Sequence, residues 1–416
     1  MKQIELQIKA LSPLAISRQK PRGSISEAMD YIPGSVIRGA IAAKILQESG
    51  HYSSDFSHNG GDFQSLFLGE NPAIFRNAYP ASLKFDDESN EIEIQSDIRV
   101  LPATALSSKN NSGFKPQKNG VFDTLIDRFC AERYGYIYEP NCPEDGYRVE
   151  PFSGFYSVFN EEYYSHSISK RLLTRVGINR RRSTAEDQIL YSIEVLNESK
   201  EKKDNPIVYS GSILIEDSQL ANSLKQFIEQ RCHDFRIGGS MSRGLGKVEI
   251  TARQPFEVSL KIEGRIQKFN RKLRKRWQTW QVFNDTQADL SDEKTYFTLD
   301  LQSDAILTEQ WRRTTVISPE MLKQLLNIED SSLQLHTVYS SYDYLSGWNT
   351  AWGLMKDVEL ITNKGAVYFF STTQLNSWLQ PLEDLEKTGI GDRTCEGFGQ
   401  VRVCDEFHLI LREEAV

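Results

Sequence analysis

Two glycine-rich stretches carry the clearest chemical signal in this sequence. One reads IGGSMSRGLGKVEI over residues 237–250, and the other reads IGDRTCEGFGQVRV over residues 390–403. Aligned without a gap, they share isoleucine, three glycines and a valine at the same positions. Glycine lets the backbone adopt positive φ, so its N–H groups can come close to phosphate oxygens. The pair therefore indicates an internal duplication and two candidate phosphate-binding loops.

The surrounding elements exclude the common nucleotide-binding loops. Rossmann and P-loop glycines lie between a strand and a helix. Both stretches here follow a predicted helix and precede a predicted strand, and neither has a Walker lysine. We expect a loop that approaches a polymer's phosphates, with charge from Arg243 and Lys247 in the first stretch and Arg393 and Arg402 in the second. The alternative is a tight loop that needs glycine only for its own turn.

Basic residues gather locally in a chain whose formal net charge is −8. Phosphate contacts need Lys and Arg, so any RNA site must be a local patch. Arg18, Lys20 and Arg22 follow the first predicted strand. The tract 180–182 (Arg180, Arg181 and Arg182), with Arg175 just before it, is expected at a loop or hairpin tip over RNA phosphates. A solvated run of charge is the alternative.

A basic amphipathic helix is predicted between the two glycine stretches. Residues 265–276 hold seven basic side chains and no acidic one. Apolar residues recur every three or four positions from Ile266 to Trp280, which predicts one apolar stripe. We expect the stripe in the seam between two domains. The basic face, with Arg271, Lys272 and Lys275, is expected to contact RNA or an acidic partner, and solvation is the alternative.

No pattern of catalytic or metal-binding residues is evident. The five cysteines and six histidines show neither Cys-x-x-Cys spacing nor a His-Glu-x-x-His motif, so we expect no metal, no cofactor and no disulfide. Of the six histidines, only His51, in a polar loop, is a candidate general base. Without a signal peptide or an apolar run long enough to span a membrane, a cytoplasmic protein is expected.

The order of elements repeats along the chain. A strand (4–11), a helix (36–46) with Ser35 as N-cap, strands (189–195 and 207–215) and a helix (219–230) precede the first glycine stretch. A hairpin (358–371) and a helix (374–386) precede the second. The length of 416 residues suits two domains. We predict an N-terminal domain (1–255) with a large insertion (about 52–165), a connecting helix (256–290) and a C-terminal domain (291–416).

Two of these motifs resemble the RAMP superfamily of CRISPR proteins. In that family Ile-Pro-Gly-Ser-x-[Leu/Ile]-[Lys/Arg]-Gly begins the first helix, as in YIPGSVIRG over residues 31–39, and a glycine loop precedes the last strand. Residues 346–349 (SGWN) and 364–369 (KGAVYF) resemble elements of subunits that cap the 5′ handle of the guide RNA. Length and layout are most similar to the large RAMP subunit of type III-D effectors.

The resemblance implies an α+β fold of two tandem ferredoxin-like (RRM-like, βαββαβ) domains with insertions, each ending in a glycine-rich loop before its last strand. It also implies crRNA binding, indirect contact with target RNA, and assembly with a large polymerase-like subunit and repeated backbone RAMP subunits. The residues implied to contact crRNA are Ser35, Arg38, Gly238, Gly239, Ser242, Arg243 and Gly244. The candidate residues of the second loop are Gly391, Arg393, Gly397 and Gly399.

One departure weakens the second loop as a phosphate site, because Glu396 stands where the first loop has Arg243. Three functions remain open. The chain is a non-catalytic crRNA-binding subunit; or an endoribonuclease that cleaves target RNA through Asp30 or precursor crRNA through His51; or a protein-bridging scaffold that touches no RNA.

Overall fold

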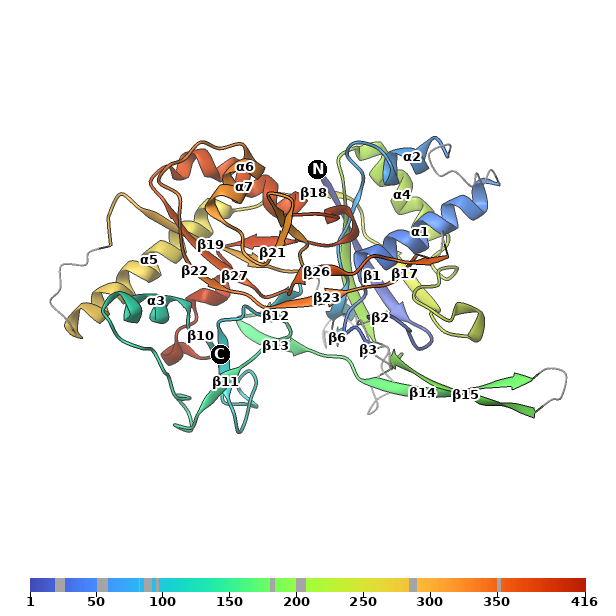
Figure 1. The fold of residues 1–416 in the computed structure, drawn as a ribbon, viewed down its shortest axis with the longest axis horizontal. Helices are drawn as coiled ribbons and strands as arrows, with labels where there is room; N and C mark the ends of the chain where they lie inside the picture. The colour runs from blue at the N-terminus through green and yellow to red at the C-terminus, as the bar shows by residue number, and fades with distance from the viewer. Residues whose placement is uncertain are drawn as a thin grey trace.

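A computed structural model describes residues 1–18, 27–50, 59–81, 83–85, 92–94, 97–179, 184–199, 207–283, 290–349 and 353–416. Figure 1 shows two halves, each built on an antiparallel sheet, with a long two-stranded ribbon extending from one side. The structure is a mixed α+β fold. Both glycine stretches lie just before the last strand of a sheet.

The N-terminal half is built on a sheet in the order β17-β1-β16-β4. Its strands are β1 (Lys2–Ala10), β4 (Ile74–Phe75), β16 (Val208–Ile215) and β17 (Val248–Ala252), with β5 (Tyr79–Ala81) and β18 (Phe256–Glu257) at its margins. Helix α1 (Gly34–Ser49) follows β1, and α4 (Ser218–Gln230) joins β16 to β17. Alternate β1 residues Ile4, Leu6 and Ile8 are fully buried, as their spacing predicts.

The start of α1 differs from the sequence prediction. The helix begins at Gly34, and its N-cap is Pro33, whose backbone is extended, with φ −62° and ψ 144°. Ser35 lies inside the first turn and does not cap the helix. A proline at this position loses nothing by lacking an N–H, because the first N–H groups of a helix have no partner within it.

The C-terminal half is built on a sheet in the order β22-β27-β19-β28. Its strands are β19 (Thr295–Leu301), β22 (Gln334–Tyr339), β27 (Val367–Thr372) and β28 (Val401–Val403), and its helices include α6 (Pro319–Leu326) and α7 (Leu375–Thr388). The predicted hairpin over residues 358–371 is wrong. Strand β26 (Glu359–Thr362) pairs with β23 (Tyr342–Leu345), whereas β27 pairs with β19 and β22.

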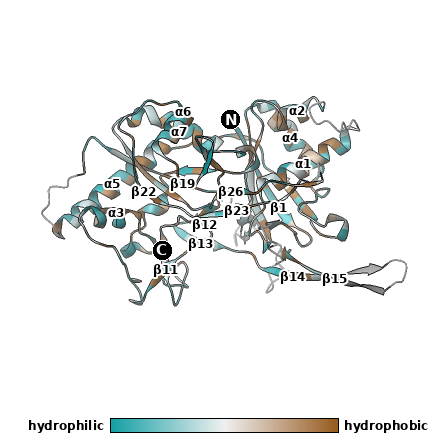
Figure 2. Ribbon diagram, in the orientation of Figure 1, coloured by the Kyte–Doolittle hydropathy of each residue, from teal (hydrophilic) through white to brown (hydrophobic). Residues whose placement is uncertain are grey.

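Helices cover both faces of the C-terminal sheet. On one face the Phe369 ring lies 4.8 Å from Phe129 of α3 (Leu125–Arg133) and 5.7 Å from Phe269 of α5 (Ile262–Trp280). On the other face Phe297 lies 6.2 Å from Trp378 of α7. The apolar stripe of the basic helix α5 is therefore buried in the core of this half, not in a seam between domains. Figure 2 shows hydrophilic and hydrophobic residues mixed along α5.

The segment 97–166 is inserted within the first half in sequence, and much of it packs on the second half in space, whereas Val100 and Phe155 pack against Tyr31 and Tyr79 of the first half. Phe122 and Tyr156 share a core cluster with Phe407. Val121 and Val416 exchange backbone hydrogen bonds of 2.8 and 3.0 Å. Strands β4 and β5, which fall in the predicted insertion, belong instead to the N-terminal sheet.

A buried ionic cluster joins the same two parts. His408 is fully buried, and its imidazole lies 3.1 Å from the Asp123 carboxylate and 2.7 Å from the Asp300 carboxylate. Asp123 belongs to β10 (Val121–Asp123) and Asp300 to β19. Burial alone would lower the pKa of His408, but the two carboxylates outweigh it and hold that pKa well above its ordinary value.

Candidate nucleic-acid interface

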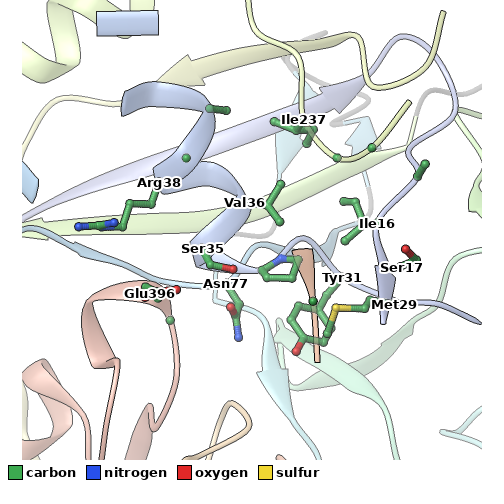
Figure 3. A pocket seen from close by; sticks show the side chains of 18 of the residues that line it. Ile16, Ser17, Met29, Tyr31, Ser35, Val36, Arg38, Asn77, Ile237 and Glu396 are labelled. Carbon is green, nitrogen blue, oxygen red and sulfur yellow. The ribbon is translucent and has the colours of Figure 1, made fainter. Parts of the chain in front are cut away.

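A groove of about 920 Å³ lies where the two halves meet. Its walls come from the first turns of α1, from both glycine stretches, and from an arm whose described residues are 342–349 and 353–362. Figure 3 shows Ser35 and Glu396 close together at the start of α1, with Tyr31 and Met29 further along the groove. Residues far apart in sequence therefore form one surface.

The start of α1 is held against the second glycine stretch. The Gly34 N–H donates to Oδ1 of Asn77 at 2.8 Å. A Cβ atom at Gly34 would overlap the Phe75 carbonyl oxygen and come within 2.8 Å of the Glu396 carbonyl oxygen. A Cβ atom at Gly397 would lie 2.6 Å from Asn77 Oδ1. Glycine is required at both positions because two backbones approach each other here.

The two glycine stretches have the same backbone conformation in register. Gly238 and Gly391 have φ of 84° and 85°, and Gly244 and Gly397 have φ of 85° and 94°. Between them lie matching 3₁₀ turns, residues 241–243 and 394–396. The predicted repeat is therefore confirmed as a repeat of geometry.

The first glycine stretch is open to solvent. The residues Gly239, Ser242, Arg243, Gly244 and Lys247 are all exposed. No atom lies within 4 Å of a Cβ placed on Gly244, so another backbone can approach there. Gly238 is different, because a Cβ on it would lie 2.7 Å from the Ala15 carbonyl oxygen. Gly238 is therefore needed for the turn itself, which is the alternative given above for a tight loop.

The structure brings two of the predicted basic residues together beside this loop. Arg175 lies on the ribbon formed by β14 (Lys170–Asn179) and β15 (Thr184–Leu196), and its guanidinium donates to the Arg243 carbonyl at 3.3 Å. The Arg243 guanidinium lies over the Tyr191 ring, 5.5 Å from its centroid, and donates to the Tyr191 hydroxyl. Two cations and an aromatic ring therefore adjoin the open loop.

In the second glycine stretch, the charge of Arg393 is paired within the stretch itself. Arg393 donates to Glu396, with 2.6 Å between Nη2 and Oε2, and stacks over Phe398. Burial would raise the pKa of Glu396, but the Arg393 hydrogen bonds and charge lower it below its ordinary value. Gly399 donates its N–H to the Asp304 carbonyl at 2.8 Å. A phosphate contact through Arg393 would have to compete with Glu396.

Four more cations line the groove, and one of them, Lys44, is paired with Glu48 and Asp234. Arg38 donates to the Phe67 carbonyl at 2.7 Å and stacks on that ring, so α2 (Asp62–Phe67) holds much of its guanidinium. Arg236 and Lys356 are exposed, and neither forms an ion pair with another described residue. Desolvation, and then the charges of Arg393 and Arg38, lower the pKa of Lys356. Lys356 and Arg236 are thus the groove cations most available to an anion.

Other predicted residues have separate locations. Arg18 ends β2 (Ser17–Arg18), and the neighbouring Ser17 lines the groove. Asp30 is half-buried beside Tyr31, whose hydroxyl donates to Asp304 at 3.3 Å. No group of three His, Cys, Asp or Glu residues suited to a metal ion occurs among the described residues. The predicted residues outside the described ranges are Lys20, Arg22, His51, Arg180, Arg181 and Arg182.

Much of the predicted basic face of α5 is paired within the chain. Lys272 lies 2.6 Å from the Glu414 carboxylate, and Arg276 lies 2.9 Å from Glu413. Arg271 and Lys275 are exposed and form no ion pair with another described residue. Two of the three predicted contact residues on this helix are therefore available to a partner.

Asn77, Arg236 and Lys356 belong to the site but to none of the predicted motifs. Asn77 acts as a helix cap from 43 positions away, which no local capping pattern could indicate. Lys356 lies on an arm of the other half, and Arg236 directly precedes the first glycine stretch. The position of Arg236 next to the glycine stretch could have indicated from the sequence that it belongs to the site.

Comparisons with known proteins agree on the family. The model of the RAMP superfamily matches residues 7–249, and the model described as CRISPR-associated protein (Cas_Cmr3) matches residues 173–404. No curated protein matches the sequence. No helix among the described residues is long and apolar enough to cross a membrane.

Three similar solved chains come from a Type III-B Cmr-beta complex, each 12% identical to this chain. The first, bound to cognate target RNA and AMPPnP, has a TM-score of 0.40 and covers 90% of this chain and 88% of its own. The second, bound to cognate target RNA, has a TM-score of 0.38 with 95% and 96% covered. The third, in the apo state, has a TM-score of 0.28 with 60% and 96% covered.

Each family match covers more than half of the chain, and together they span both glycine stretches. The predicted type III-D subtype is not what the second model names, and it stays a prediction. The chain belongs to the RAMP superfamily and to the Cas_Cmr3 family within it, and is a RAMP subunit of a type III CRISPR effector complex.

Proposed function

We propose that this chain binds crRNA in the groove between its two halves, holding the 5′ repeat-derived handle without cleaving RNA. The observation that carries the proposal is the convergence on one groove of the first turn of α1 and both glycine stretches. Exposed backbone at Gly239 in the groove and at Gly244 beyond it suits contact with phosphates, which dominate protein–RNA affinity. Arg236 and Lys356, which form no ion pair with another described residue, add positive charge in the groove.

We also infer that each half is a ferredoxin-like βαββαβ unit. In the first half the order β17-β1-β16-β4, with α1 and α4 as the connecting helices, supports this inference. In the second half the order β22-β27-β19-β28, with α6 and α7, supports it equally. Duplicated units related in this way would place two glycine loops on one composite groove.

The predicted protein partners follow from the same assignment. As a cytoplasmic ribonucleoprotein subunit, the chain would bridge the large polymerase-like subunit and the backbone RAMP subunits, and would meet target RNA only through the guide. Arg271 and Lys275 of α5, exposed on the C-terminal half, are candidate contacts for one of these partners.

The test is the crRNA content of the purified effector complex. Arg175→Glu combined with Arg243→Glu reverses two charges beside the first glycine stretch, and we expect crRNA retention to be lost. Lys118→Glu is the control for charge reversal, because Lys118 is exposed but lies on the inserted segment. Unchanged crRNA in the double variant would refute the proposed binding site.

A further inference from the structure

A tyrosine pair lies beside the groove on the arm whose described residues are 342–349 and 353–362. The arm consists of β23, β24 (Trp348–Asn349), β25 (Leu354–Met355) and β26, and Figure 1 shows β23 and β26 reaching from the C-terminal half toward β1. Tyr342 and Tyr344 are 61% and 46% exposed. Their rings touch edge to face, with centroids 6.2 Å apart.

The two rings project from the same face of β23, because side chains two residues apart share a face of a strand. Leu345, Ser346 and Gly347, which follow Tyr344 directly, line the groove. A polymer that leaves the groove along this strand therefore meets Tyr344 first and Tyr342 next. By the same alternation Leu345 falls on the opposite face of β23, so the tyrosine pair adjoins the groove through Ser346 and Gly347, which directly follow the strand.

An exposed cation near the pair is Lys356, with the exposed Asp357 next to it in the chain, and both line the groove. Lys356 donates its backbone N–H to the Gly347 carbonyl at 2.7 Å, so the two residues are neighbours on the arm. Gly347 also lines the groove. Glu359, opposite Leu345 in the β23–β26 ladder, is paired with Arg313 at 2.6 Å. Asp343 falls on the other face of β23 by alternation and accepts from the Tyr344 N–H at 2.7 Å.

We propose that Tyr344 and Tyr342 form a stacking platform for unpaired bases of single-stranded RNA as the strand leaves the groove. The inference rests on the proposed function and adds to it how the bases are held. Flat aromatic rings beside cations are the usual means of holding single-stranded RNA, since every base offers a face for stacking. Phosphates would contact Lys356 while the bases stack on the rings.

The end of the arm has a different character. Leu354 and Met355 are 62% and 59% exposed, and aliphatic side chains offer no ring for a base to stack on. We therefore assign only the tyrosine pair to RNA. Two aromatic side chains with polar hydroxyl groups, next to a groove whose cations Arg236 and Lys356 form no ion pair with another described residue, fit RNA better than they fit an apolar protein surface.

The experiment uses the full-length chain and a synthetic single-stranded RNA with the sequence of the repeat-derived handle. The fluorescent base 2-aminopurine replaces one nucleotide at a time, and stacking is read as quenching of its fluorescence. We expect quenching at one or two adjacent positions. It should be lost in Tyr342→Ala and Tyr344→Ala but retained in Tyr342→Phe and Tyr344→Phe, because phenylalanine keeps the ring.

Affinity gives a second readout. Each alanine variant should bind the RNA roughly tenfold more weakly, with the salt dependence unchanged because no charge is removed. Tyr147→Ala is the control, since Tyr147 is 62% exposed but lies on the inserted segment. Its fluorescence and affinity should match those of the unmodified chain.

The outcomes separate this inference from the proposed function. If the unmodified chain does not bind the RNA, the proposed function fails. If it binds, and Arg175→Glu with Arg243→Glu abolishes binding while the tyrosine variants leave quenching and affinity unchanged, only the stacking platform is refuted. Loss of a protein subunit from the complex with RNA binding intact would also overturn it, and would assign the tyrosines to a protein interface.

Discussion

Asn77 Oδ1 accepts a hydrogen bond from the Gly34 N–H at 2.8 Å. The same oxygen would lie only 2.6 Å from a Cβ atom placed on Gly397. One amide thus caps the first helix of the N-terminal half and receives the second glycine loop of the C-terminal half. The geometry of the groove depends on this contact, because it brings the loop of one half against the helix start of the other.

Substitution of the two equivalent loop glycines should have unequal effects. Alanine in the left-handed region costs about 1–2 kcal/mol at either position. Gly397→Ala adds a clash with Asn77 and the Phe75 carbonyl, worth roughly another 1–3 kcal/mol, whereas Gly244→Ala meets no atom within 4 Å. Urea unfolding of the two variants measures the difference. Equal loss of stability would show that the second loop is not wedged between the halves.

The buried ion pair of α5 should matter more for stability than its exposed pairs. Arg265 and Glu386 are separated by 2.6 Å, and their side chains are 9% and 7% exposed. Arg265→Met strands the carboxylate and should lower the free energy of unfolding by about 3–5 kcal/mol. Lys268→Met, which removes an exposed partner of Glu406, should cost less than about 1 kcal/mol. Similar costs in denaturant titrations would contradict this account.

His408 should make stability depend on pH. Because Asp300 and Asp123 raise its pKa in the folded state, its contribution is complete below an unfolded pKa of about 6.5 and is lost as pH rises through the folded-state pKa. Between the two values the free energy of unfolding should fall by about 1.4 kcal/mol per pH unit. His408→Gln should remove that slope from unfolding curves recorded across pH.

His233→Gln provides the control for this measurement, since His233 is exposed. Parallel pH profiles for the unmodified chain and His408→Gln would mean that folding does not shift the pKa of the buried imidazole. The inserted segment would then be held on the C-terminal half by apolar packing, without a stabilising contribution from the charge of His408.

RNA binding should weaken in alkaline solution before an ordinary lysine loses its proton. Desolvation and the neighbouring guanidinium groups lower the pKa of Lys356, so its charge disappears below the usual value of about 10.4. Lys356→Arg should keep binding constant over the same range, because a guanidinium stays charged. Lys118→Arg is the control. An identical decline in all three proteins, measured by fluorescence anisotropy, would exclude Lys356 from the contact.

Local patterns predicted the elements well. The alternation in β1, the period of α5 and the register of the glycine stretches each depend on residues close in sequence, and all three are present in the structure. The hairpin over 358–371 was wrong for a clear reason. Turn residues such as Asn363 and Gly365 indicate that the chain reverses, but they do not determine which strand becomes the neighbour.

The candidate site was only partly predictable, because its walls come from both halves. Ser35 was predicted to be the N-cap of α1, but Pro33 holds that position. The side-chain amide that accepts the Gly34 N–H belongs to Asn77, which is distant in sequence. The bidentate pairing of Arg393 with Glu396 could not be read from their spacing alone. The tyrosines at 342 and 344 carried no motif, and only their exposure beside the groove distinguishes them.

The packing of segment 97–166 on residues 407–416 also bears on how the protein is made. During synthesis this segment leaves the ribosome well before the residues that complete its core. Phe122 and Tyr156 stay without Phe407 until translation is almost finished, so their apolar surface is exposed to other nascent chains in the meantime. The two halves therefore cannot fold one after the other as independent domains. A shortened chain that lacks residues 407–416 would leave this apolar surface permanently exposed.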